Sequence, residues 1–387
     1  MRSICIFLFL LDAFLSVAQS REAVKMAKET PIIDTHIDFP WRLKSQKAWP
    51  APGYAQYALA NPEGDFDYAR AKKGGLSAAF MSIYIPAAVQ QDPEHSRQLA
   101  DSLIDLVHEI ARAHPDKFAL AMRADDVLRN FNKGLISLPM GMENGAPIRT
   151  KADVAHFHER GIRYVTLTHS RDNHICDSSY DTLHTNAGLS EQGRELVREM
   201  NKVGIMIDVS HLTDKAVWDV LEVSKKPVIA THSACRHFTP GYDRNLPDAL
   251  IKAIAAKGGV IQVPFSYYFL SVESRRFYLD AAARMKDLEL SPDTPEGRKW
   301  MRKELKKSDI GVKAVADHID YIRRLAGIEY VGLGSDFDGV GLALPPDLAD
   351  VSMYPNLIDE LLRRGYTRDD LRKICYQNVM RVWRENE

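Results

Sequence analysis

The stretch "PIIDTHIDFP", residues 31–40, runs from an apolar, strand-like segment into two side chains that can bind a metal ion or carry a proton. Residues i and i+2 of a β-strand point to the same face, so His36 and Asp38 are expected to lie together at the end of this strand. They could form a hydrogen-bonded pair that closes the strand, or they could supply part of a metal site. The remaining sequence favours the second interpretation.

Further segments of apolar, β-branched character follow along the chain, at residues 77–85, 135–142, 162–168, 205–209, 227–231, 259–263 and 330–335. Amphipathic helical patterns separate them. Strands that alternate with helices in this way predict an α/β fold, a (β/α)8 TIM barrel, with the C-terminal helices at 355–364 and 369–384 packed on the outside. A doubly wound open sheet is the alternative, because periodicity alone cannot show that a sheet closes.

The first twenty residues, "MRSICIFLFLLDAFLSVAQS", differ from the rest of the chain. Arg2, an apolar run and the small residues Ala18 and Ser20 predict a signal peptide over residues 1–20, and an uncleaved anchor is the alternative. Export to the periplasm or the medium is therefore expected. Residues 21–387 are then expected to form a single barrel domain. The sequence has no second apolar run long enough to cross a bilayer.

Side chains that bind metals or carry protons stand at the ends of six of the predicted strands. Because the carboxyl ends of parallel strands meet at one rim of a barrel, we expect these side chains to converge. Imidazole and carboxylate ligands suit zinc and, less often, manganese, cobalt or iron. Five of them suffice for two metal ions with a glutamate between them. The residues are His36, Asp38, Glu143, His169, His211, His232 and Asp336.

The strings that carry these residues resemble, in the same order, those of the membrane dipeptidase (renal dipeptidase) family of zinc peptidases in the amidohydrolase superfamily. They are "DTHIDFPWRL", "GMEN", "YVTLTHS", "DVSH", "THSAC", "RNLPD" and "GLGSDFDGV". The resemblance extends from about residue 31 to about residue 383. It implies two zinc ions per chain, one held by His36, Asp38 and Glu143. The bridging Glu143, His211 and His232 would hold the other.

The resemblance also implies three roles in substrate binding and catalysis. His169 would bind and polarise the carbonyl oxygen of the bond that is cut, and Arg244 would bind the terminal carboxylate of the substrate. Asp336 would handle the proton, with the neighbouring Asp338 as the alternative. Arg236 lies close to Arg244 in the sequence, and either arginine could instead pair with a surface acid. The segment "PFSYYFLS", residues 264–271, departs from the family pattern, so the side-chain specificity stays open.

The resemblance predicts a binuclear zinc dipeptidase in which a metal-bridging hydroxide attacks the amide carbonyl. The expected partner is a small dipeptide, a homodimer is possible, and the net charge of −1 argues against nucleic acid. Another binuclear amidohydrolase, acting on a lactone, a cyclic amide or a phosphoester, is one alternative. His169, where many such enzymes have a bridging lysine, favours the dipeptidase. A non-catalytic, exported metal-binding protein is the other alternative, and the intact Asp336 argues against it.

Overall fold

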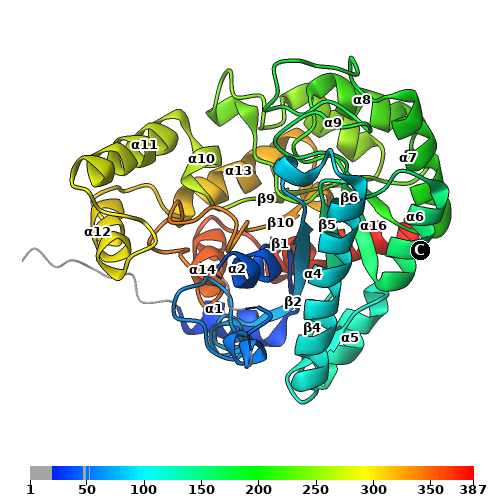
Figure 1. Ribbon diagram of the computed structural model, residues 1–387. Coiled ribbons are helices and arrows are strands. Elements are labelled where there is room, and N and C mark those ends of the chain that lie inside the picture. Colours follow the sequence, from blue (N-terminus) through cyan, green and yellow to red (C-terminus); the bar gives the residue numbers. More distant parts are fainter. Residues whose placement is uncertain (1–19, 47–48, 52) are drawn as a thin grey trace, which may run out of the picture.

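The computed structural model describes residues 20–46, 49–51 and 53–387 (Figure 1). The predicted signal peptide, residues 1–20, lies outside this range except for Ser20. The side chain of Ser20 accepts a hydrogen bond from the backbone of Ala23 and so caps the first helix, α1 (Arg21–Glu29). The family resemblance of the chain thus falls almost entirely within the described part.

Ten parallel strands form one sheet, and eight of them close into a barrel in the order β1, β2, β5, β6, β7, β8, β9, β10. The strands are β1 (Ile32–Ile37), β2 (Leu76–Tyr84), β3 (Phe118–Leu120), β4 (Ile136–Leu138), β5 (Met140–Glu143), β6 (Ile162–Thr166), β7 (Met206–Asp208), β8 (Ile229–Ala230), β9 (Val260–Val263) and β10 (Val331–Leu333). The prediction of a (β/α)8 barrel is confirmed, and the open sheet is wrong.

The barrel closes where the end of β1 meets the segment after β10. Phe337 accepts a hydrogen bond from the backbone N–H of Asp38 (2.9 Å), and His36 accepts one from that of Asp336 (3.1 Å). The buried carboxylate of Asp34 reinforces this junction, because its Oδ1 accepts the N–H groups of His36 and Ser335, each at 3.0 Å. The segments that meet here carry three of the predicted site residues, His36, Asp38 and Asp336.

The segment predicted as one strand at 135–142 is divided by Pro139 into β4 and β5. Proline has no N–H to donate, so the ladder cannot run through it unbroken. β4 pairs with β2 through Ala78 and Ser137, and from Met140 onward β5 pairs with the following part of β2. The strand β3, which the sequence analysis did not predict, adds to β4 outside the barrel. Its three residues are too short for a period-2 pattern.

Helices surround the barrel, and one of them is the helix predicted at residues 355–364, which spans residues 354–363. They are α2 (Phe39–Ser45), α3 (Tyr68–Gly74), α4 (Pro93–Ala113), α5 (Ala124–Asn132), α6 (Lys151–Arg160), α7 (Glu191–Val203), α8 (Asp214–Val223), α9 (Asp248–Ala256), α13 (Val312–Leu325) and α14 (Tyr354–Arg363). Within the described residues, no helix has both the length and the apolar character needed to cross a membrane.

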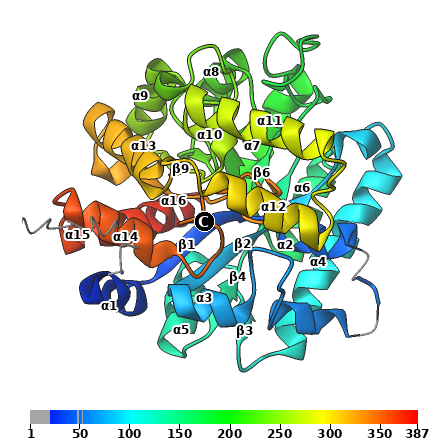
Figure 2. The ribbon, with the colours of Figure 1, turned by 90° about the vertical axis from the view of Figure 1, so that its left-hand side faces the viewer.

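The two ends of the barrel are covered by different helices (Figures 1 and 2). The long connection after β9 forms α10 (Tyr267–Leu270), α11 (Val272–Asp287) and α12 (Pro295–Leu305) beside the carboxyl ends of the strands. The C-terminal segment, α15 (Arg368–Arg372), a π-helical turn and α16 (Asn378–Asn386), packs on the outside, as predicted. Trp383 of α16 is fully buried against Phe80, with ring centroids 5.0 Å apart, and closes the opposite end. The strands therefore open toward α10–α12.

Candidate metal centre

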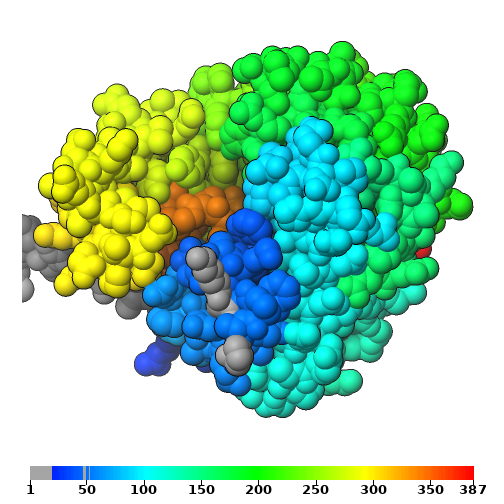
Figure 3. Space-filling model, viewed as in Figure 1, coloured from blue at the N-terminus to red at the C-terminus, as the bar shows by residue number. Residues whose placement is uncertain are grey.

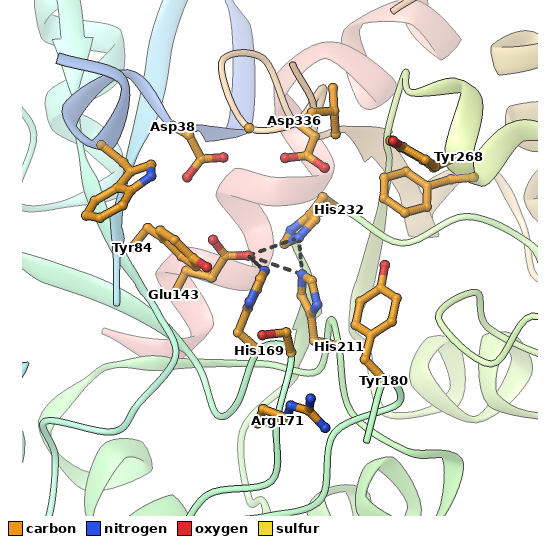
Figure 4. Close-up of a pocket in the computed structure, with 15 residues that line it drawn as sticks. Asp38, Tyr84, Glu143, His169, Arg171, Tyr180, His211, His232, Tyr268 and Asp336 are labelled. Carbon is orange, nitrogen blue, oxygen red and sulfur yellow. Dashed lines mark hydrogen bonds and ion pairs between the residues drawn. The ribbon is translucent and has the colours of Figure 1, made fainter. Parts of the chain in front are cut away.

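The carboxyl ends of the strands open into a cavity of about 740 Å³. Figure 3 shows a hollow between the yellow helices α11 and α12 and the body of the barrel, and Figure 4 shows the side chains that line the cavity. Its walls include the aromatic side chains of Trp41, Tyr84, Tyr180, Tyr268 and Phe269. Of the predicted site residues, those that line it are Asp38, Glu143, His169, His211, His232 and Asp336.

Glu143, at the end of β5, lies at the centre of the predicted ligands. Its Oε1 atom lies 3.1 Å from Nε2 of His211, 3.4 Å from Nε2 of His232 and 3.7 Å from Nε2 of His169. Its Oε2 atom lies 3.5 Å from Nε2 of His36. One buried carboxylate thus faces imidazoles from four different strand ends, which is the position that a bridging ligand requires.

His36 and Asp38 lie together, with 3.4 Å between Nε2 and Oδ2. The register of β1 shifts between Asp34 and Ile37, so the strand is irregular just where His36 projects. Asp38 itself lies beyond the strand, at the N-cap of α2. His36 and Asp38 therefore meet through an irregular strand end and a helix start, and not through regular strand alternation.

Three sets of side chains could each hold a metal ion, because the ligand atoms within each set lie within 4.8 Å of one another. His36 occurs in two of the sets and Glu143 also in two, and His169 and Asp336 are each part of one set. The sets do not by themselves divide the ligands into the two groups that the family resemblance implies. The sets are His36, Glu143 and His232; Glu143, His169 and His211; and His36, Asp38 and Asp336.

Hydrogen bonds fix which nitrogen of His36 is available to a metal ion. The hydroxyl of Tyr164, on β6, donates to the backbone oxygen of Thr35 (3.0 Å) and lies 2.9 Å from Nδ1 of His36. Because that hydroxyl proton is already used, Nδ1 of His36 must be the donor to Tyr164. Nε2 is therefore the nitrogen of His36 that can offer a lone pair to a metal ion, and it faces Glu143.

A hydrogen bond to a neighbouring hydroxyl also orients His232. The hydroxyl of Thr231 donates to Oδ2 of Asp208 (2.6 Å) and lies 2.8 Å from Nδ1 of His232. Nδ1 of His232 is therefore the donor, and its Nε2 lone pair points at Glu143. Asp208, at the end of β7, is fully buried and also accepts a hydrogen bond from the hydroxyl of Thr166. Sequence analysis missed these supports, although Thr231 directly precedes a predicted ligand.

The position of Tyr164 depends on Gly141 of β5. A Cβ atom at residue 141 would lie 2.0 Å from Cζ of the Tyr164 ring, far inside contact distance. Only glycine leaves room for the ring to cross the barrel interior and reach His36. Gly141, two residues before Glu143 in the string "GMEN", thus supports the site by leaving room for Tyr164.

The electrostatics of the cluster suit metal binding. Burial lowers the pKa of His211 and His232 well below the usual value, and the positive charge of Arg244 acts in the same direction, so both imidazoles are neutral. Burial raises the pKa of Glu143, but the surrounding histidines outweigh it and hold that pKa well below its usual range. Among the described residues, Nε2 of His36 and Oδ1 of Asp38 are buried without a hydrogen-bond partner. His36 differs: burial lowers its pKa, but Tyr164 and the carboxylates of Glu143 and Asp38 outweigh burial and hold that pKa well above its usual value, so a metal ion bound there would displace a proton. Two neutral imidazoles, carboxylates and buried atoms without partners fit a bound metal ion.

Asp336 and Asp338 have different surroundings. Asp336 lines the cavity beside His36 and Asp38, and burial raises its pKa to about 7. Asp338 instead exchanges hydrogen bonds with Asp65: its Oδ1 accepts from the N–H of Asp65 (2.7 Å), and its own N–H donates to Oδ2 of Asp65 (2.9 Å). Asp338 therefore holds the loop after β1, while Asp336 faces the cluster. Both aspartates have a positive φ, 67° for Asp336 and 64° for Asp338, so the contacts of their side chains, and not the backbone, separate their roles.

The two candidate arginines also differ. Arg236 forms a two-point ion pair with Asp214, at 2.7 and 2.6 Å, and so has a structural role. Arg244 is 3% exposed and lies behind the cavity wall, where it donates to Oγ of Ser233 (3.0 Å) and lies 3.1 Å from Nε2 of His211. Within the described residues, no carboxylate pairs with it. A buried cation without a counter-ion is costly, so an anionic partner is expected.

A parallel (β/α)8 barrel with histidine and carboxylate side chains gathered around one glutamate at its mouth is typical of a metal-dependent hydrolase of the amidohydrolase type. The family model described as "Membrane dipeptidase (Peptidase family M19)" matches residues 20–387, and the chain belongs to this family. It is an enzyme, a metallodipeptidase, and the predictions of family and enzyme class are confirmed.

Curated relatives and solved structures agree with this assignment. The chain is 33% identical to the dipeptidase tcpJ of Claviceps purpurea over 331 residues, 84% of this chain and 70% of the relative. The probable dipeptidase PvdM of Pseudomonas aeruginosa has a similar structure, with a TM-score of 0.79, 25% identity and coverage of 94% of this chain and 97% of that one. A metallo peptidase of Rhodobacter sphaeroides, liganded with a phosphinate mimic of the dipeptide L-Ala-D-Ala, has a TM-score of 0.76 at 26% identity, with coverage of 92% and 99%.

Proposed function

We propose that this protein is a binuclear zinc dipeptidase that hydrolyses the amide bond of free dipeptides. The observation that carries the proposal is the position of Glu143, whose two carboxylate oxygens face His36 on one side and His211 and His232 on the other. We propose His36, Asp38 and Glu143 as ligands of one zinc ion. Glu143, His211 and His232 are the proposed ligands of the second. Nitrogen and oxygen donors without a thiolate are compatible with catalytic zinc.

When bound, the pair of zinc ions supplies Lewis-acid chemistry, by polarising the carbonyl group and activating the attacking water. The residues of the chain position the substrate and move the proton. His169, at the end of β6, is the proposed donor to the carbonyl oxygen, because its imidazole lines the cavity beside Glu143. Asp336 is the proposed carrier of the proton to the leaving amine.

The charges around the cavity suit a dipeptide with both termini free. Asp38 and Asp336 lie on one side of the cluster and can attract an ammonium group (Figure 4). Arg244, buried beside His211, can bind the terminal carboxylate through the planar fork of its guanidinium. The complex of the Rhodobacter sphaeroides neighbour with a dipeptide mimic supports the same substrate class, with a D-residue in second position.

A metal count and a substrate panel test this function. Zinc-loaded protein is expected to contain two zinc ions per chain and to hydrolyse dipeptides with L- or D-residues in second position. Activity should disappear with chelator and return with zinc. N-acetylated dipeptides, which lack the free ammonium, are the control and should be poor substrates. Protein that binds zinc but cleaves only a lactone, cyclic amide or phosphoester, or cleaves nothing, would contradict the proposal.

We also propose that residues 21–387 form one catalytic domain that is exported behind a cleaved leader of residues 1–20. The support is the sequence of that leader, with its basic start, apolar run and small residues before the cleavage position. Determination of the N-terminal residue of the mature protein tests the proposal, and Arg21 is the expected result. A homodimer stays a prediction, which sedimentation velocity can test.

A further inference from the structure

Arg171 is the only arginine or lysine among the described residues that line the cavity. It follows His169 and Ser170 directly, so it stands at the rim next to the proposed donor to the substrate carbonyl. In Figure 4 it lies beyond His169 and His211, on the side opposite Asp38 and Asp336. A cation therefore faces the part of the cavity that lies away from the carboxylates.

The guanidinium of Arg171 is largely uncommitted. Its side chain is 64% exposed, and its ion-pair partner is Asp181, at 3.7 Å. Asp181 does not depend on that contact, because its oxygens already accept the backbone N–H groups of Asp172 (3.1 Å) and Leu183 (3.2 Å). An exposed ion pair at this distance contributes little, so Arg171 is free to bind another anion.

The loop that carries Arg171 is held in place by buried carboxylates. The backbone oxygen of Arg171 accepts a hydrogen bond from the hydroxyl of Thr168, and the carboxylate of Asp172 accepts N–H groups from Ser178 and Thr185, each at 2.8 Å. Asp177, 1% exposed, accepts the N–H groups of Asn186 and Gly188, each at 2.7 Å. A backbone held this firmly presents the arginine at a defined place on the rim.

Arg244 and Arg171 flank the same pair of histidines. Arg244 lies 3.1 Å from Nε2 of His211, whose ring centroid is 4.3 Å from that of His169, and Arg171 follows His169 by two residues at the rim. If the buried Arg244 binds the terminal carboxylate, the side chain of the same residue points toward the rim. Aromatic walls can accept many side chains, but Arg171 supplies the positive charge of an arginine or lysine among the described residues that line the cavity.

We propose that Arg171 is a specificity-determining residue that recognises an acidic side chain on the C-terminal residue of the dipeptide. This inference rests on the proposed dipeptidase function and adds a substrate class to it: dipeptides that end in glutamate or aspartate, with two carboxylates on the second residue. Arg244 binds the terminal carboxylate, and Arg171 binds the side-chain carboxylate.

The test compares Ala-Glu with its neutral isostere Ala-Gln, each with an L- and a D-residue in second position. The wild type should have the higher kcat/KM for the Glu substrate of the preferred stereochemistry. Arg171→Gln should lower kcat/KM for that substrate about tenfold, the worth of one charge-assisted hydrogen-bonded pair, while the value for Ala-Gln stays within about twofold. Arg171→Glu should shift the preference toward Ala-Lys.

A matched control is Arg198→Gln, which removes an exposed arginine of α7 that does not line the cavity. This variant should leave the ratio of the two kcat/KM values unchanged. Equal losses on Ala-Glu and Ala-Gln in Arg171→Gln, or no preference for Ala-Glu in the wild type, would overturn the inference while the dipeptidase function stands. A wild type that cleaves none of the dipeptides, Ala-Gln included, would instead reject the proposed function.

Discussion

The hydroxyl of Thr231 offers a sharp test of how the proposed metal ligands are oriented. Thr231 is fully buried, donates to Asp208 and accepts from Nδ1 of His232. The substitution Thr231→Val keeps the shape of the side chain and removes both bonds. Nδ1–H of His232 then lacks an acceptor, and a buried polar group without a partner costs about 1–3 kcal/mol. The imidazole can escape this cost by rotating or by changing tautomer, and either change misdirects Nε2.

The expected result is zinc binding about 10- to 100-fold weaker at the site that uses His232, the usual effect of losing a partner of a metal-bound histidine. Competition with a chromophoric zinc chelator measures this affinity in protein from which the metal has been removed and then titrated back. Activity should fall with zinc occupancy at low free zinc. Excess zinc should restore most of it, because the ligand atom itself is still present.

Thr166→Val is the matched control. Thr166 is also fully buried and also donates to Oδ2 of Asp208 from a neighbouring strand, but it bonds no histidine. Thr231→Val should lose more thermal stability in the metal-free protein, because it also removes the bond to His232, and only Thr231→Val should lose zinc affinity. Equal zinc affinities in the two variants would refute the idea that Thr231 acts by fixing the imidazole of His232.

Three further predictions test other parts of the structure. Asp336→Asn should lower kcat by about 10²–10⁴-fold with two zinc ions still bound, and loss of one zinc would instead identify Asp336 as a ligand. Arg244→Ala should raise KM for free dipeptides far more than for their C-terminal amides, and equal effects would remove the carboxylate clamp. His318 is neutral in the core: its Nδ1 accepts the N–H of Cys235 (3.0 Å), its Nε2 lies 2.9 Å from the oxygen of Leu270, and burial lowers its pKa to about 4. In the unfolded chain His318 binds a proton below about pH 6.5, but in the folded chain it does so only near pH 4. The free energy of unfolding should therefore decrease by about 3 kcal/mol in total as the pH is lowered from 6.5 to 4. His318→Gln should therefore flatten the dependence of Tm on pH between 6.5 and 4 in zinc-free protein, and an unchanged slope would contradict this assignment.

The sequence alone determined the elements of the barrel and the residues that converge at its mouth. Period-2 apolar runs and amphipathic helices are local patterns, so every predicted strand was found, and the equivalence of strand ends in a parallel barrel brought Glu143 to His36, His211 and His232. Among the strands, the local patterns did not predict the division at Pro139 or the short strand β3.

The tertiary structure decided what supports and surrounds those residues, because such contacts join segments that are far apart in the sequence. Tyr164 reaches His36 only because Gly141 lacks a Cβ atom, and nothing local to "YVTLT" signals that contact. The burial of Arg244 and the exposure of Arg171 likewise depend on how loops after different strands pack at the rim. Donor types can be recognised in a sequence, but tautomers, counter-ions and the charge of a cavity wall are properties of neighbours that folding alone brings together.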